Sequence, residues 1–198
     1  NFMEYIHHIQ ALIKEQKALG AVEEERGSRY GHIPQIAPEA YNIYTFAPLT
    51  DEQLALLERV LNREVPKQYK IFLTLFSNGM HIFSRCLNLY GLQGVLDRRG
   101  DFQGPFDLSI PNVYERPSNA DSNCFFLGSY SYDGSLLYIK DDVSTVYYCA
   151  RRDATPIKEW PSFSDMLIEE IQRLKSLHNA DGILKSTRRS TLPISEDT

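Results

Sequence analysis

Residues 49–91 read LTDEQLALLERVLNREVPKQYKIFLTLFSNGMHIFSRCLNLYG, and the order of helix and strand signals in them sets the architecture of the chain. Thr50 and Gln53 have the spacing of a capping box, in which each side chain binds the backbone N–H of the other residue. Leucines follow at helical spacing, so we predict a helix over 51–63. Pro66 starts a second helix, because its fixed φ suits the first helical position and its missing N–H costs nothing there.

Beyond Asn78-Gly79, which ends the second helix because glycine accepts left-handed backbone, the apolar period changes from helical to alternating. Short β-branched or aromatic runs bounded by turn residues predict strands at 87–91, 124–127, 136–140 and 143–149. Asp133-Gly134 and Asp141-Asp142 lie between consecutive runs, and such residues tolerate the backbone of a hairpin turn. We therefore predict that the last three strands form an antiparallel meander.

The segments around this core include one predicted helix and two stretches rich in Gly and Pro. Apolar residues at helical spacing predict an amphipathic helix over 2–19. Residues 20–48 combine Glu, Gly and Pro, so we predict a connector whose aromatic residues pack on the main domain. Residues 92–123 contain too many Gly and Pro for a long helix or a central strand, and we predict a loop-rich insert.

The last predicted helix begins at Ser162, which stands three residues before Asp165 as an N-cap. Glu169 and Arg173 have i, i+4 spacing on its outer face, which predicts an ion pair between them. The residues after the helix are polar with few apolar side chains, so we expect them to be flexible. The predicted organisation is an N-terminal helix and connector extension at 1–48, a main domain at 49–184 and a flexible polar tail at 185–198.

The composition is that of an ordinary globular protein: 198 residues, with 21 Lys and Arg against 26 Asp and Glu, and a formal net charge of -5. A mildly acidic chain lacks the positive field that nucleic-acid binding requires, so we predict no direct nucleic-acid ligand. No apolar run reaches the ~18 residues of a membrane span, and Glu4 and Lys14 interrupt the region where a signal peptide needs an apolar core. We predict a cytoplasmic protein with no membrane partner.

The sequence offers few residues for catalysis or metal binding. The three cysteines are far apart, and no histidine stands at metal-ligand spacing from another or from a cysteine. Cys124 could act as a nucleophile with His81 as its base, but a cysteine in a predicted strand usually serves as a small apolar residue. Phosphate-binding glycine motifs and the nucleophile elbow are absent. We predict no catalytic residue, no cofactor and no metal.

Motifs in a fixed order along the chain carry a family resemblance. They are Leu49-Thr50, Leu54, Leu57-Glu58, Leu61, Val65-Pro66, Tyr69-Lys70, Phe72-Leu73, Asn78-Gly79, Leu87, Leu89, Tyr90-Gly91, Phe126-Leu127-Gly128, Asp133-Gly134, Leu137, Ile139, Asp141, Trp160, Ser162-Phe163 and Met166-Leu167. This ordered set resembles the SMI1/KNR4 family, also called the SUKH superfamily, over about residues 49–177. Val65 stands where the family usually has leucine, and the leader before Leu49 is longer than the family core needs.

The resemblance implies an α+β fold in which helices pack on one curved, largely antiparallel sheet. Characterised bacterial members are mostly immunity proteins that bind and silence a toxin domain, often a nuclease, whereas others regulate wall assembly in eukaryotes or bind the secretion machinery. What they share is protein binding and not chemistry, so by analogy we predict a non-catalytic immunity protein that neutralises a cognate toxin by occlusion. The alternative is a regulatory or scaffold protein of the same fold that binds a cellular partner. The sequence carries no signal of oligomeric state.

Tyrosines and acids near the last hairpins form the surface best suited to such a partner. Tyrosine offers a large contact area with few rotatable bonds, and carboxylates complement the basic groove of a nuclease. We predict partner binding by Tyr130, Tyr132, Asp133, Asp141, Asp142 and Glu115, joined by Asp97, Asp101, Asp107 and Asp121 of the insert. The alternative is that the tyrosines cover the outer sheet face and the acids are solvated loop residues.

Overall fold

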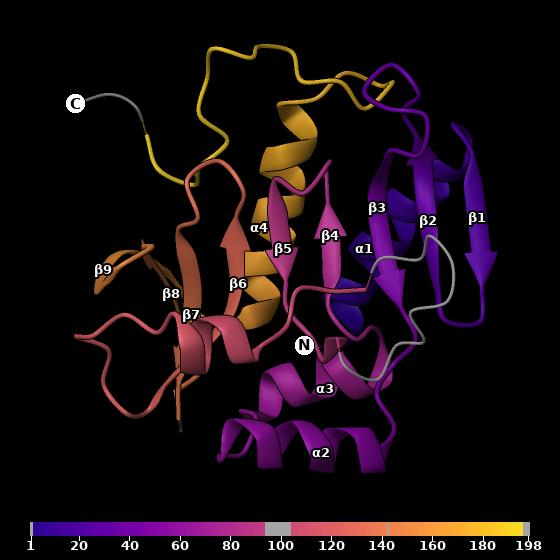
Figure 1. Cartoon of the computed structure of the whole chain (residues 1–198). Coiled ribbons are helices and arrows are strands. Elements are labelled where there is room, and N and C mark those ends of the chain that lie inside the picture. Colours follow the sequence, from indigo (N-terminus) through magenta and orange to yellow (C-terminus); the bar gives the residue numbers. More distant parts are fainter. Residues whose placement is uncertain (1, 94–103, 142, 196–198) are drawn as a thin grey trace.

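A computed structural model of the chain describes residues 2–93, 104–141 and 143–195 (Figure 1). Within these residues one sheet of nine strands follows chain order from β1 to β9, and every neighbouring pair is antiparallel. The strands are β1 Ala21–Glu24, β2 Gly27–His32, β3 Tyr41–Phe46, β4 Met80–Ile82, β5 Leu87–Leu89, β6 Cys124–Tyr130, β7 Leu136–Lys140, β8 Val146–Ala150 and β9 Asp153–Trp160. The sheet is open, because β1 and β9 are its two edges.

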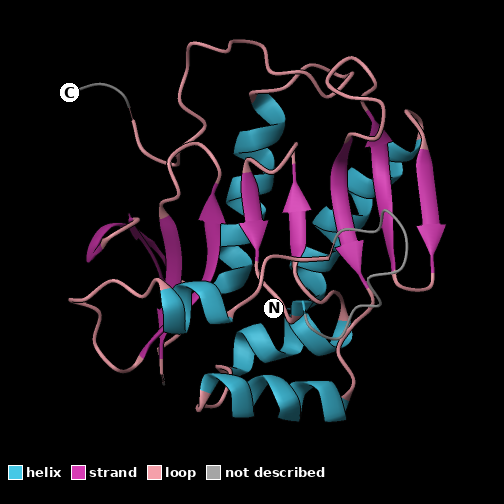
Figure 2. Ribbon diagram, viewed as in Figure 1, coloured by secondary structure: helices cyan, strands magenta, loops and turns pink. Residues whose placement is uncertain are grey.

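Four α-helices lie on one face and at one end of the sheet (Figure 2). They are α1 Phe2–Lys17, α2 Asp51–Leu61, α3 Lys67–Leu75 and α4 Phe163–Ser176. In the described part of the chain, α1 and α4 run behind the strands and α2 and α3 lie at one end, whereas a short π-helical segment, η2 Ile110–Tyr114, lies in front of β6 and β7. The predicted α+β class, with helices on a largely antiparallel sheet, is confirmed.

An aromatic cluster joins three of the helices in the core. Tyr5 of α1, Tyr69 and Phe72 of α3 and Phe163 of α4 are all buried. The ring centroids of Tyr5 and Phe163 lie 5.4 Å apart in edge contact, and those of Phe72 and Phe163 are also 5.4 Å apart. Aromatic pairs at this separation contribute about 0.5–1.5 kcal/mol each beyond their burial. The N-terminal helix is therefore part of the core.

The predicted helix caps are confirmed. The backbone N of Gln53 donates to Oγ1 of Thr50 at 3.2 Å, and the backbone N of Thr50 donates to Oε1 of Gln53 at 3.0 Å. Asn62 ends α2 in the left-handed conformation, with φ 53°. At α4 the backbone N of Asp165 donates to Oγ of Ser162 at 3.1 Å. These bonds satisfy N–H groups that the first turn of a helix leaves unpaired.

The meander predicted from residue 124 is confirmed, since β6 pairs with β7 and β7 with β8. The chain continues it with β9, which the sequence did not predict. Pro156 lies within β9, and proline removes an N–H from the ladder. It is tolerated because β9 is an edge strand whose outer groups have no neighbouring strand.

The connector predicted for residues 20–48 is wrong, because this segment forms strands β1, β2 and β3 of the same sheet. Its glycines were read as turn signals. Gly31 instead lies in β2 with φ 76°, and a Cβ added there would collide with Oε1 of Gln16 on α1. A glycine inside a strand often marks such a close approach.

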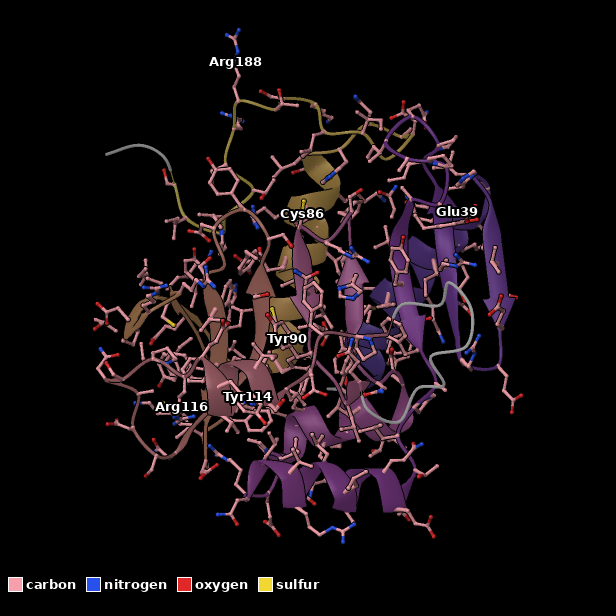
Figure 3. The ribbon with its side chains drawn as sticks, in the orientation of Figure 1. Glu39, Cys86, Tyr90, Tyr114, Arg116 and Arg188 are labelled. Atoms are coloured by element: carbon pink, nitrogen blue, oxygen red, sulfur yellow. The ribbon has the colours of Figure 1, made fainter. Side chains whose placement is uncertain are left out.

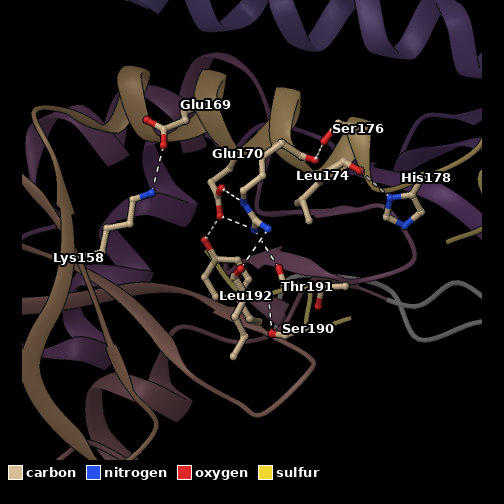
Figure 4. Close-up of polar contacts among 11 residues, drawn as sticks. Lys158, Glu169, Glu170, Leu174, Ser176, His178, Ser190, Thr191 and Leu192 are labelled. Atoms are coloured by element: carbon tan, nitrogen blue, oxygen red, sulfur yellow. Dashed lines mark hydrogen bonds and ion pairs between the residues drawn. The ribbon is translucent and has the colours of Figure 1, made fainter. Parts of the chain in front are cut away.

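The predicted ion pair between Glu169 and Arg173 is also wrong. Arg173 binds Glu170, donating from Nε to Oε2 at 2.6 Å and from Nη2 to Oε1 at 2.9 Å (Figure 4). Glu169 binds Lys158 of β9, with Nζ 3.1 Å from Oε1. Glu170 has no exposed surface and also accepts a hydrogen bond from the Tyr130 hydroxyl. A buried carboxylate requires such partners, and this one determines the position of Arg173.

The chain beyond α4 differs from the flexible tail that we predicted for 185–198. Thr191 is buried and Leu192 packs against the core. Their carbonyl oxygens accept hydrogen bonds from Arg173, at 2.9 and 3.1 Å. The physical reason is that a guanidinium has five donors, and Glu170 takes only part of them. The boundaries at 48 and 184 stay predictions.

Candidate functional site

The predicted partner-binding residues fall into two open grooves of the described structure. Groove A, of about 820 Å³, is lined mainly by residues 115–118, 129–134 and 151–152, with η2 at one end. Groove B, of about 900 Å³, lies between the first turn of α3 and the β7–β8 hairpin. η2 places groove A on the sheet face opposite α1 and α4. Tyr90 and Arg116, which line groove A, are labelled in Figure 3.

A polar network crosses the sheet beneath groove A. Nδ1 of His81 lies 2.7 Å from Oδ1 of Asn88, and Nδ2 of Asn88 donates to Oγ of Ser131 at 2.9 Å. The hydroxyls of Tyr90 and Ser129 are 2.8 Å apart. Burial lowers the pKa of His81 to about 4 and raises the pKa of Tyr90. Both side chains are therefore uncharged near neutral pH.

The structure does not bring Cys124 and His81 together as a nucleophile and its base. His81 pairs across the sheet with Asn88, and Asn88 pairs with Ser129. Cys124 begins β6, five residues before Ser129, which corresponds to about 16 Å along a strand. Burial raises the pKa of the Cys124 thiol, so the reactive thiolate is disfavoured. The preferred interpretation, a small apolar residue in a strand, fits this position.

The two predicted tyrosines have opposite environments. Tyr132 is 59% exposed on groove A, whereas Tyr130 has no exposed surface and its hydroxyl donates to Glu170 of α4. Tyr130 therefore cannot contact a partner, and its inclusion was wrong. Residues two apart share a face only while a strand continues, and β6 ends at Tyr130. The chain then turns, which releases Tyr132 to the surface.

The predicted acids do not converge on one surface. Asp133 and Glu115 line groove A, but Asp141 lies in groove B at the other end of β7, where its Oδ1 is 2.7 Å from Nη2 of Arg63. Asp107 accepts hydrogen bonds from the backbone of Gln93 and Ser109, which is a structural role. Asp121 is an exposed loop residue near Lys140, at 4.0 Å. Asp97, Asp101 and Asp142 lie outside the described residues.

Sequence reasoning missed two features of groove A. The first is η2, which places Val113 and Tyr114 at the surface with 49% and 76% exposure. The second is the pair Arg151 and Arg152, which forms the two-residue turn between β8 and β9. The signals available in the sequence were Ile110, Val113 and Tyr114 inside a Gly/Pro-rich insert, and the adjacent Arg151 and Arg152.

Arg116 also lines groove A, but its guanidinium is held by contacts within the protein. Its Nη1 donates to the carbonyl of Cys124 at 2.9 Å, and its guanidinium lies 5.4 Å from the ring centre of Phe126. Arg151 and Arg152 are exposed by contrast. Groove A therefore combines exposed aromatic and apolar side chains with charges of both signs, which is the usual composition of a protein-binding surface.

Among the described residues, no helix is long and apolar enough to cross a bilayer. No three His, Cys, Asp or Glu side chains in these parts of the chain gather as a metal ion would require.

The fold and this surface define a class: an α+β protein with helices on one face of an antiparallel sheet and an open groove on the other. The chain belongs to the SMI1/KNR4 family (SUKH-1), whose sequence model matches residues 48–169. The predicted resemblance is thus confirmed. The match covers β4 to β9 and leaves α1 and β1 to β3 outside it. Curated protein sequences contain no match to the chain.

Proposed function

We propose that the protein is a non-catalytic immunity protein that binds a cognate toxin domain in the cytoplasm and occludes it. Family membership supports a protein-binding role. The single observation that carries the proposal is the exposure of two tyrosines: Tyr132, which lines groove A and is 59% exposed, and Tyr114, which directly precedes the groove residue Glu115 and is 76% exposed. Large aromatic side chains held open on a rigid face are the residues that most often dominate binding energy in protein complexes.

The surroundings of these tyrosines support the same function. Ile110 and Val113 extend the apolar area, with 39% and 49% exposure. Glu115, Asp133 and the two arginines of the β8–β9 turn surround it with charge. An apolar centre with a polar rim excludes water from the centre and sets the partner's orientation at the rim. The sheet supplies a stiff base for this arrangement.

The test is protection of growth when the chain is co-expressed with a toxin domain from a gene directly upstream of its own; an isolated gene would favour the regulatory or scaffold function. We expect the native chain to protect, and we expect Y114A/Y132A to lose protection while keeping its circular dichroism and melting temperature. The matched control is I36A/L75A, which removes two side chains of 55% and 64% exposure away from groove A. The control should protect like the native chain.

Two outcomes would count against the proposal. If the native chain gave no protection and did not bind the adjacent toxin domain, the regulatory or scaffold function would replace immunity. If Y114A/Y132A protected as well as the control, the binding surface would lie elsewhere, with groove B as the next surface to vary.

A further inference from the structure

We propose that groove A binds an acidic segment of the partner protein through Arg151 and Arg152. This rests on the proposed function, since the segment belongs to the partner that the protein binds. It reverses the charge expected from the sequence, where acids were predicted to meet a basic partner. Arg151 and Arg152 form few hydrogen bonds within the described structure, whereas nearby carboxylates accept hydrogen bonds from the turns.

The guanidinium groups of Arg151 and Arg152 are largely unused within the described structure. Nη2 of Arg151 is 3.9 Å from Oε1 of Glu115, too far for a hydrogen bond, and Arg152 has no hydrogen bond or ion pair with a described residue. Arg63 and Arg173, by contrast, each donate to a carboxylate and to backbone carbonyls. A guanidinium offers five donors in a planar fork that matches a carboxylate, and neither arginine donates a hydrogen bond to a described carboxylate.

Two other acids near the pair, Asp133 and Asp153, accept hydrogen bonds within their own turns. Oδ1 of Asp133 accepts from the backbone N of Ser135 at 2.9 Å. Oδ1 of Asp153 accepts from Nδ2 of Asn119 at 2.7 Å and from the backbone N of Thr155 at 3.0 Å, and these bonds lower its pKa. Neither carboxylate forms an ion pair with Arg151 or Arg152 in the described structure, so among these acids only Glu115 approaches the arginines.

The floor of the groove adds further donors. Tyr90 and Ser129 share one hydrogen bond, which uses one hydroxyl hydrogen and leaves the other to donate. Oγ of Ser131 accepts from Asn88, so its own hydrogen is also available. A groove that presents mainly donors selects a partner rich in acceptors, and carboxylates provide them with the matching charge.

Packing against the β6–β7 turn also fixes the position of the Arg151 side chain. Gly134 has φ 76°, and a Cβ added to it would lie 2.9 Å from Cδ of Arg151, so the arginine stem packs directly on this glycine. The groove, of about 820 Å³, is far larger than a single phosphate, so it accommodates an extended segment. A peptide that combines carboxylates, which bind Arg151 and Arg152, with apolar contacts to Tyr132 fits a groove of this size.

The test uses the full chain and three probes: fluorescein-labelled hexaglutamate, labelled hexalysine and inorganic phosphate. Binding is followed by fluorescence anisotropy and by the arginine Nε–Hε resonances in nitrogen-15 spectra. We expect hexaglutamate to bind and to shift Arg151 and Arg152. R151E/R152E should raise its Kd roughly tenfold or more and should favour hexalysine.

The matched control is R188E/R189E, which reverses another adjacent pair of exposed arginines. It should change the Kd less than about twofold, since that pair lies outside groove A. R151Q/R152Q removes charge without reversing it and should give an intermediate loss, which guards against a folding defect in R151E/R152E. Rising salt should weaken binding to the native chain more than to R151Q/R152Q.

Three results would overturn the inference: equal losses in R151E/R152E and R188E/R189E, stronger binding of hexalysine than of hexaglutamate, or phosphate shifting the two arginines where hexaglutamate does not. The last result would identify a small-anion site. If these tests fail while Y114A/Y132A still abolishes protection, the proposed function stands and only the acidic partner is refuted. If the arginine tests succeed while the native chain gives no protection against the toxin domain, the groove binds acidic segments but the protein is not an immunity protein.

Discussion

Replacing Arg173 by methionine should destabilise the protein strongly, because the Glu170 carboxylate would stay buried without its counter-charge. Glu170 is 0% exposed and Arg173 is 23% exposed in their side chains. Removing one partner of a buried pair costs about 3–5 kcal/mol, and the partial exposure of Arg173 favours the lower end, about 3 kcal/mol. For a chain of this size the melting temperature should fall by roughly 6–12 °C. Methionine preserves much of the packing of the arginine stem.

The measurement is urea unfolding followed by circular dichroism, with three comparisons. K158M breaks the pair between Lys158 of β9 and Glu169 of α4, whose side chains are 30% and 54% exposed, and should cost less than about 1 kcal/mol. R173M/E170Q removes the buried charge as well and should recover at least about 1 kcal/mol relative to R173M. If R173M and K158M had equal effects, or if E170Q restored nothing, burial of the carboxylate would not be the cause.

Two further outcomes are expected. Removing residues 185–198 should lower the unfolding free energy by about 2 kcal/mol, because Arg173 loses two carbonyl acceptors, and calorimetry that shows an unchanged melting temperature would mean that the tail is not held. Stability should fall as pH decreases from 7 to 4: His81 has a folded pKa of about 4 against 6.5 in the unfolded chain, so protons bind the unfolded state first. The drop attributable to His81 is about 3 kcal/mol, and H81Q should flatten the stability profile over this range; identical profiles would exclude His81 as the source.

The elements that depend on neighbouring residues followed from the sequence. The capping bonds of Thr50 with Gln53 and of Ser162 with Asp165 join residues three positions apart, so no distant contact is needed to form them. The meander of β6 to β8 followed because its turn residues and apolar runs alternate over a short distance.

Elements stabilised by distant contacts did not follow from the sequence. Gly31 signals a turn in isolation, but it lies in β2 because Gln16 of α1 occupies the space where a side chain would be. Pro156 argues against a strand, but it is accepted at the sheet edge. In both cases the deciding contact or position belongs to the assembled sheet.

The composition of the candidate site was likewise decided by tertiary structure. Tyr132 and Asp133 are consecutive residues of one turn, so both line groove A, and their role in partner binding stays a prediction. It could not show that Tyr130 points to α4 or that Asp141 lies at the other end of β7 beside Arg63. Which charges face each other depends on strand register and on which carboxylates become buried, and only the packed chain sets those distances.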